Sequence, residues 1–183
     1  TDLYLAFDLL VALAPANVAG VASERTVAVA STAKTPTGVM VRDPHAAFPD
    51  LSALQADLDA VTRASENRYF DAMAMTEGLF GDSVTANMFQ VGVAYQIGAI
   101  PIAAGAIEQA IELNGAAIDA NKWAFRWGRM LAIDPDRVRA ASVLAEDHLA
   151  KPSAALAAAI IAAGLDDGEL GRIVRLRAPD LVD

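Results

Sequence analysis

The chain has 183 residues, no cysteine and a formal net charge of −9, and 55% of its residues are hydrophobic. This length allows one well-buried domain with at most a small appendage. The acidic balance argues against a nucleic-acid partner, and the lack of cysteine excludes disulfides, thiolate metal sites, cysteine nucleophiles and any iron–sulfur cluster held by this chain.

The N-terminal half of the sequence predicts an α/β arrangement. Apolar and valine-rich runs closed by polar turns are typical of strands covered on both faces, whereas apolar residues spaced by three and four are typical of helices. On this basis we expect strands at 9–13, 26–31 and 68–74, helices at 16–22 and 51–63, and a loop over 42–50. A strand, a short helix and a strand in this order suggest a right-handed parallel crossover.

The second half is expected to be helical, with helices at 84–95, 103–113, 117–131, 136–150, 153–163 and 167–177. The Ala-rich run that starts at Ser153 and stops at Gly164 is shorter than the roughly 18–20 residues that span a bilayer, so no membrane segment is expected. The predicted fold is therefore α/β, with a Rossmann-like, mostly parallel sheet in the N-terminal half and a helix-rich C-terminal half. We expect residues 1–133 to form the α/β domain and residues 134–183 to form a helical C-terminal extension.

An ordered series of short motifs runs through the chain. The last members are Glu112-Leu113-Asn114-Gly115, Asn121, Ala124-Phe125 and Gly128-Arg129. The earlier ones are Lys34-Thr35-Pro36-Thr37-Gly38, Arg42-Asp43-Pro44, Leu79-Phe80-Gly81-Asp82, Asn87-Met88-Phe89, Gly92, Tyr95-Gln96, Gly98 and Pro101. In this order they resemble the gamma-type domain of 2-oxoacid:ferredoxin oxidoreductases, and most of all the long, fused indolepyruvate ferredoxin oxidoreductases.

This resemblance implies a role within a larger enzyme. Members of the family decarboxylate a 2-oxoacid oxidatively to an acyl-CoA in the cytoplasm and pass the electrons to ferredoxin. Thiamine diphosphate forms the carbanion adduct and iron–sulfur clusters carry the electrons, while the protein positions these groups. Both cofactors are bound elsewhere in the family's architecture. We therefore expect an accessory domain that binds no cofactor itself and packs against other domains or subunits of an oligomeric enzyme.

The resemblance also bears on the two ends of the chain. The family's domain begins with a strand and a Gly-rich turn, and neither is found in this sequence, which opens at Thr1. The last residues, 175–183, are similar to the start of a helix that continues in the long members. We therefore expect this chain to be part of a longer polypeptide.

Two other interpretations stay open. One is a stand-alone, non-catalytic protein-interaction module, and the other is an independent nucleotide-binding enzyme. The second is disfavoured because a phosphate cradle needs clustered glycines, whereas Gly20, Gly38, Gly78, Gly81 and Gly92 are isolated. The nearest candidate, 35–38, is interpreted as a capped turn.

No catalytic, cofactor-binding or metal-binding residue is predicted. His45 and His148 are too few and too far apart to supply a metal site, and no Gly-x-Ser-x-Gly elbow is present. Glu108 and Glu112 share a helical face, where paired carboxylates could act in acid–base chemistry. A solvated acidic face is the favoured interpretation.

A partner interface is predicted around Trp123, Arg126 and Arg129, because tryptophan and arginine are enriched in interface hot spots. Trp127 belongs to the small-residue stripe of its helix and is expected in the core, with Trp123 at the edge of that stripe. An ordinary helix with a buried tryptophan stripe and solvated arginines is the alternative.

Structural roles are predicted for three asparagines of the motifs, Asn87, Asn114 and Asn121. An asparagine among Ala and Phe on a packed helix usually bonds a neighbouring backbone, since buried amides must be satisfied. We expect Asn114 at a helix–helix junction and Asn121 as a cross-link within the domain.

Overall fold

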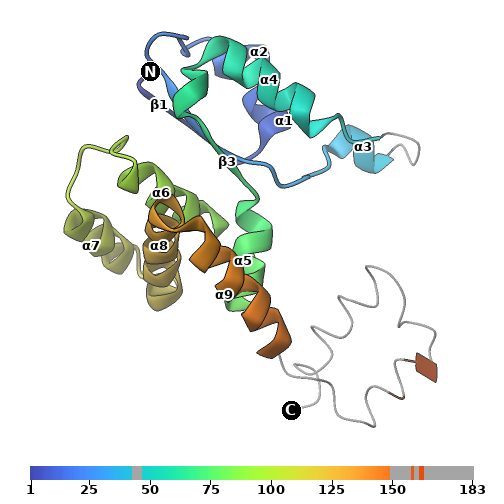
Figure 1. Ribbon diagram of the computed structural model, residues 1–183, viewed down its shortest axis with the longest axis vertical. Helices are drawn as coiled ribbons and strands as arrows, with labels where there is room; N and C mark the ends of the chain where they lie inside the picture. The colour runs from blue at the N-terminus through green and yellow to red at the C-terminus, as the bar shows by residue number, and fades with distance from the viewer. Residues whose placement is uncertain (43–46, 149–157, 159–160, 163–183) are drawn as a thin grey trace.

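The computed structural model describes residues 1–42, 47–148, 158 and 161–162 (Figure 1). Apart from positions 158, 161 and 162, the helices expected over 153–163 and 167–177 lie outside the described residues, together with Ser153, Gly164 and His45.

A three-stranded parallel sheet forms the centre of the N-terminal part, with strand order β1-β2-β3. The strands are β1 (Leu3–Ala6), β2 (Val27–Ser31) and β3 (Arg68–Phe70). The helices α1 (Leu9–Ala12) and α2 (Pro15–Val18) connect β1 to β2. The connection from β2 to β3 contains α3 (Gly38–Arg42), α4 (Leu51–Val61) and a single 3-10 turn, η1 (Ala64–Glu66). The α/β prediction is thus confirmed.

Two of the expected strands are corrected. The strand expected over 9–13 is wrong: Leu9–Ala12 form helix α1, because the Asp8 carboxylate accepts the backbone N–H groups of Leu10 and Val11 and caps a helix there. The strand lies earlier, at β1. The strand expected over 68–74 ends at Phe70, because Asp71 caps the next helix by accepting from Ala74 N at 2.9 Å.

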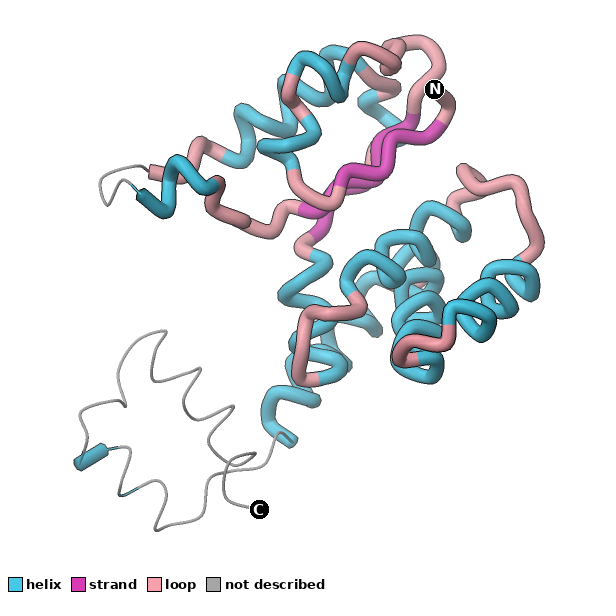
Figure 2. Tube along the Cα trace, turned by 180° about the vertical axis from the view of Figure 1, so that it is seen from behind, coloured by secondary structure: helices cyan, strands magenta, loops and turns pink. Residues whose placement is uncertain are grey.

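The side chains of the sheet alternate between two cores, as the pleat requires. Helices cover both faces of the sheet (Figure 2). On the face of α1 and α4, the core consists of small strand residues and leucines: Ala6, Ala28, Ala30, Leu9, Leu54 and Leu58. The core on the opposite face includes Val29, Phe70, Phe89 and Val93 together with alanines of the helices. The two faces of the sheet therefore pack against different sets of helices.

The helix-rich C-terminal half begins directly after β3. It contains α5 (Ala72–Phe80), α6 (Ala86–Gln96), α7 (Ala104–Asn114), α8 (Ile118–Ile133) and α9 (Pro135–His148). Helix α6 contacts β1 and β2, and α8 lies against α6. Helix α7 packs against Phe125 of α8 through Ile107 and Ile111. Helix α9 runs beside α5 (Figure 1), with Ser142 against Gly78. The proposed division at residue 133 stays a prediction.

The crossing of α6 and α8 is a contact of backbone on backbone. A Cβ atom added to Gly92 would lie 2.1 Å from the carbonyl oxygen of Phe125, and one added to Gly128 would lie 1.8 Å from the carbonyl oxygen of Phe89. Each helix therefore presents its glycine to a carbonyl of the other helix. Any side chain at either position would force the two helices apart.

We expect Gly128→Ala to destabilise the protein by about 3 kcal/mol or more, because the methyl group has no space at the crossing. Gly105→Ala is the matched control, since nothing lies within 4 Å of a Cβ on that helical glycine. The control should be neutral or stabilising by about 0.4–1 kcal/mol. Urea unfolding measures both changes. Equal midpoints for the two variants would contradict the crossing.

Candidate functional site

Gln90 fastens helix α6 to the sheet. Its side chain is fully buried, and Nε2 donates hydrogen bonds to the carbonyl oxygens of Ala6 at 2.8 Å and Val29 at 2.7 Å. These residues belong to neighbouring strands, so one amide fixes the position of α6 against both. Oε1 of Gln90 is buried without a hydrogen-bond partner. The sequence analysis did not single out Gln90. The available signal was a polar side chain between the apolar residues Phe89 and Val91 of a packed helix.

A second buried amide, Asn67, fastens α4 to the sheet. Its Oδ1 accepts from Ala28 N at 2.7 Å, and its Nδ2 donates to Asp59 at 2.6 Å and to Thr62 Oγ1 at 2.7 Å. Tyr69 donates to the same Asp59 oxygen at 2.7 Å. Burial, followed by this hydrogen bond to Asp59, raises the pKa of Tyr69 above its ordinary value. The group is a satisfied polar cross-link between α4 and β2.

Arg129 forms one wall of a hollow at the end of α6. The hollow has a volume of about 380 Å³ and is lined by Tyr95, Gln96, Gly98 and Pro101, among others. The Arg129 guanidinium lies 5.1 Å from the centroid of the Tyr95 ring, and its Nε donates to Gln96 Oε1 at 3.0 Å. Motif residues that are far apart in the sequence meet here, because the crossing of α6 and α8 brings position 129 beside position 96.

Trp123 and Arg126 lie on a different surface of α8. Trp123 is 54% exposed, and the Arg126 guanidinium lies 5.6 Å from its ring centroid. Arg126 also donates two hydrogen bonds to the Glu108 carboxylate of α7, from Nε at 3.0 Å and from Nη2 at 2.8 Å. Through this hydrogen bond, Arg126 holds the pKa of the Glu108 carboxyl below its usual value. The pair therefore presents an aromatic ring beside an arginine whose charge is already balanced.

The two glutamates of α7 do not form a simple solvated acidic face. Glu108 is paired with Arg126, and Glu112 forms an ion pair with Lys122 of α8. Both bridges link α7 to α8 from the outside. Because these pairs are partly exposed to solvent, they orient the helices more than they stabilise them.

The three predicted interface residues thus fall in two places. Trp123 and Arg126 lie together, whereas Arg129 lies in the hollow beside Tyr95 and contacts the ring of Phe125 at 5.8 Å from its centroid. Trp127 packs partly buried against the large core, and Ala124 next to Phe125 is fully buried.

The three predicted structural asparagines lie nearer the surface than expected. Asn87 is exposed on α6, and Asn114 is exposed as the last residue of α7, directly before Gly115 in the left-handed conformation. Asn121 donates through Nδ2 to the carbonyl oxygen of Ala116 at 3.0 Å, which ties the first turn of α8 to the segment before it. The junction position of Asn114 is as expected, and Gln90 and Asn67 occupy the buried positions.

The turn over 35–38 contains a local cap. The Thr37 hydroxyl accepts from Met40 N at 3.4 Å at the start of α3. This contact uses the hydroxyl within the chain. In the described residues, no group of three or more His, Cys, Asp or Glu side chains is placed to hold a metal ion.

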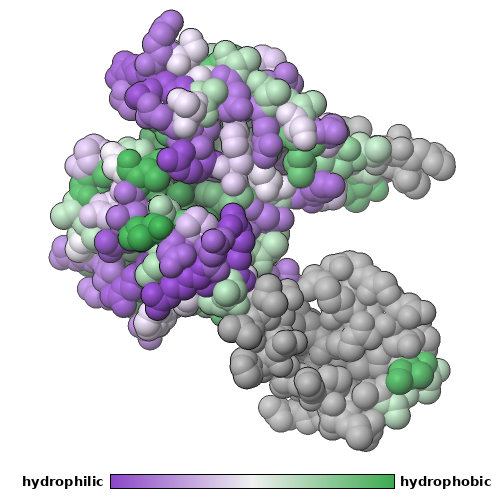
Figure 3. All heavy atoms as spheres, in the orientation of Figure 1, coloured by the Kyte–Doolittle hydropathy of each residue, from purple (hydrophilic) through white to green (hydrophobic). Residues whose placement is uncertain are grey.

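Several large apolar side chains are exposed on the helical half, among them Val84, Ile102, Leu113, Trp123 and Ile133. On the face of the molecule that Figure 3 shows, hydrophobic residues form separate patches among polar ones. Within the described part of the chain, no helix has both the length and the apolar character needed to span a bilayer.

Comparisons of the chain with protein-family models, with curated proteins and with solved structures found no match. The resemblance to the oxidoreductase family therefore stays a prediction from the motifs.

We expect Gln90→Met to destabilise the protein by about 1–3 kcal/mol, because the buried carbonyls of Ala6 and Val29 lose their donor. Asn87→Met, on the exposed side of the same helix, is the control and should change stability by no more than about 0.5 kcal/mol. Chemical unfolding of both variants gives the comparison. A stable Gln90→Met variant would show that the amide is not the link.

We expect Trp123→Ala to weaken association with a partner or a second copy more than it weakens folding, because the ring is exposed beside Arg126. Trp127→Ala is the control and should mainly lower the melting temperature, since that ring packs on the core. Sedimentation and thermal melts separate the two effects. A monomeric wild type, or a Trp123→Ala variant that unfolds, would count against the interface.

Proposed function

We propose that this chain is the gamma-type accessory domain of a thiamine-dependent 2-oxoacid:ferredoxin oxidoreductase of the indolepyruvate type. In the complete enzyme, a 2-oxoacid is decarboxylated oxidatively to an acyl-CoA, and ferredoxin accepts the electrons. The observation that carries the proposal is that motif residues of α6 and α8, namely Phe89, Gly92, Phe125 and Gly128, meet at the crossing of these helices.

The motif residues of α6 and α8 contact one another at the crossing. The motif 87–89 supplies the Phe89 carbonyl against which Gly128 lies, and the motif 124–125 supplies the Phe125 carbonyl against which Gly92 lies. Arg129 in turn reaches Gln96. These motif residues of α6 and α8 therefore share one structural task, which supports the proposal that they belong to one domain architecture.

The same observation supports an accessory role. The motif residues at the crossing contact backbone, rings and amides of their own domain, so they serve the packing of the helices. Thiamine diphosphate and iron–sulfur clusters belong, in this proposal, to other domains or subunits of a cytoplasmic oligomer. The contribution of this domain is to hold a rigid surface against those partners, with Trp123 and Arg126 on that surface.

The alternative is a stand-alone protein-interaction module. Its support is the exposed Trp123 beside Arg126, because tryptophan and arginine are enriched in interface hot spots. The complete reading frame and its gene neighbours separate the two. Thiamine-binding and Cys-rich segments in the same polypeptide or in adjacent genes support the oxidoreductase, and an isolated short gene supports the module.

We expect the isolated chain to show no oxidoreductase activity, because it has no cysteine to bind a cluster. The assay combines purified chain, a 2-oxoacid, CoA, thiamine diphosphate and a viologen dye. Activity is expected only after the remaining domains or subunits are added. Reduction of the dye by the chain alone would refute the accessory role.

A further inference from the structure

A second, larger hollow opens at the amino ends of the three strands. It has a volume of about 600 Å³ and lies between the first residue of each strand, Leu3, Val27 and Arg68, and the segment that follows α6. Gly98 and Pro101 of that segment line both this hollow and the one beside Arg129. We call it the amino-edge cavity. None of the motif residues of α8 lines it.

The amino-edge cavity gathers positive charge in an acidic protein. Only five lysines and arginines occur among residues 1–121, and three of them, Arg25, Arg63 and Arg68, line this cavity. Two carboxylates also line it, those of Asp2 and Glu66. The charged side chains of the wall therefore sum to a positive charge, although the whole chain carries −9.

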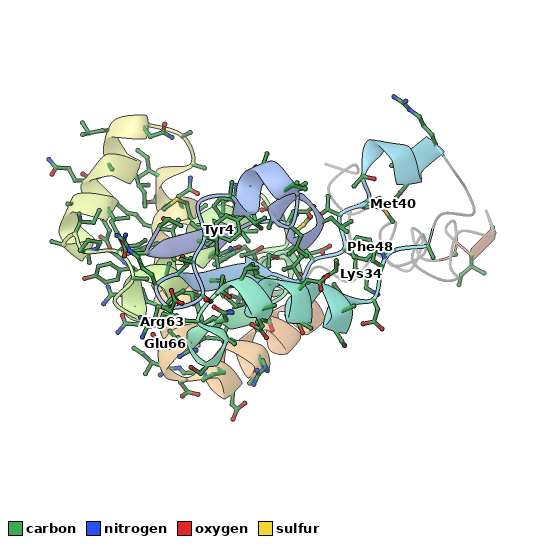
Figure 4. All side chains as sticks on the ribbon, turned by 90° about the horizontal axis from the view of Figure 1, so that it is seen from above. Tyr4, Lys34, Met40, Phe48, Arg63 and Glu66 are labelled. Carbon is green, nitrogen blue, oxygen red and sulfur yellow. The ribbon has the colours of Figure 1, made fainter. Side chains whose placement is uncertain are left out.

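The three arginines differ in how their charge is balanced. Arg25 forms a bidentate pair with Asp2, with Nε at 2.5 Å and Nη2 at 2.9 Å from the carboxylate oxygens. Arg63 pairs with Glu66, and the two lie side by side in Figure 4. Arg68 donates through Nη1 to the backbone oxygens of Glu66 at 2.8 Å and Asn67 at 2.9 Å. Among the described residues, no carboxylate forms an ion pair with Arg68.

We propose that the amino-edge cavity binds a phosphomonoester, with Arg68 as the main contact to the phosphate and Arg25 and Arg63 beside it. An arginine held by two carbonyls is oriented but not neutralised, and its remaining N–H groups fit a phosphate bidentately. Leu3, Val27 and Pro101 supply apolar wall for the organic part. The volume suits a ligand of mononucleotide size.

The charge of the cavity favours a single phosphate over a diphosphate. A phosphomonoester carries about −1.5 to −2 at pH 7, which one unbalanced arginine and two flanking ones can accommodate. Diphosphates are commonly bound together with a divalent cation held by carboxylates. Here the carboxylates of Asp2 and Glu66 are engaged by arginines. This inference does not depend on the proposed oxidoreductase function.

Titration calorimetry of the chain with inorganic phosphate, AMP and adenosine tests the proposal. AMP is expected to bind with a Kd of about 0.1–1 mM, inorganic phosphate more weakly, and adenosine not measurably. Binding should weaken as salt is added, because the contact is ionic. Equal binding of adenosine and AMP, or binding of neither AMP nor phosphate, would overturn the proposal.

Charge variants sharpen the test. Arg68→Gln should weaken AMP binding at least about tenfold, because it removes the unbalanced guanidinium. Glu66→Gln should tighten binding, because it releases Arg63 and removes a repelling charge. Arg139→Gln, an exposed arginine paired with Asp136 on α9, is the matched control and should bind as the wild type does. Thermal melts check that all variants fold. Unchanged affinity in Arg68→Gln, or weaker binding in Glu66→Gln, would contradict the site.

Discussion

The crossing of α6 and α8 at Gly92 and Gly128 is the constraint on which the rest of the molecule depends. Two helices can approach to backbone contact only where neither carries a side chain, and each glycine here meets a carbonyl of the opposite helix. Because α6 also touches β1 and β2, the crossing sets how the helical half sits against the sheet. The packing of Ile107 and Ile111 of α7 against Phe125 follows from the same placement, since Phe125 belongs to α8.

Buried amides and exposed ion pairs have different tasks in this fold. Gln90 and Asn67 each reach backbone groups of the sheet from a neighbouring element, in places where water is excluded. A backbone group of the sheet that lost its hydrogen bond there would be costly, so these amides favour one arrangement of helix and strand. The ion pairs Arg25–Asp2 and Arg126–Glu108 lie nearer the solvent, where such pairs are worth about 0–1 kcal/mol. They direct local geometry and leave the stability to the cores and the amides.

The sequence predicted the elements whose apolar pattern fits either a helix or a strand but not both. The long helices and β2 lie where their stripes and valines placed them, and Gly92 was expected to allow close packing. The apolar run 9–13 has no period that separates a buried strand from a helix, and the Asp8 cap decided for the helix. The asparagines of the motifs drew attention by their spacing, whereas Gln90 and Asn67 bond across 61 and 39 positions respectively. No local pattern reports contacts over such distances, so the buried cross-links had to come from the structure.

The motif residues of α6 and α8 and the arginines of the amino-edge cavity occupy different places in the fold. The motif residues of α6 and α8 lie at the crossing and at the Arg129 hollow, where the Tyr95 ring and the Gln96 amide already contact the arginine. The arginines of the amino-edge cavity belong to none of the motifs, and one of them lacks a carboxylate partner among the described residues. The two hollows share the segment with Gly98 and Pro101, so the rigid crossing positions one wall of the cavity. The helix crossing and the arginine-lined cavity thus lie on opposite sides of one short segment, and the packing of α6 and α8 fixes where that segment begins.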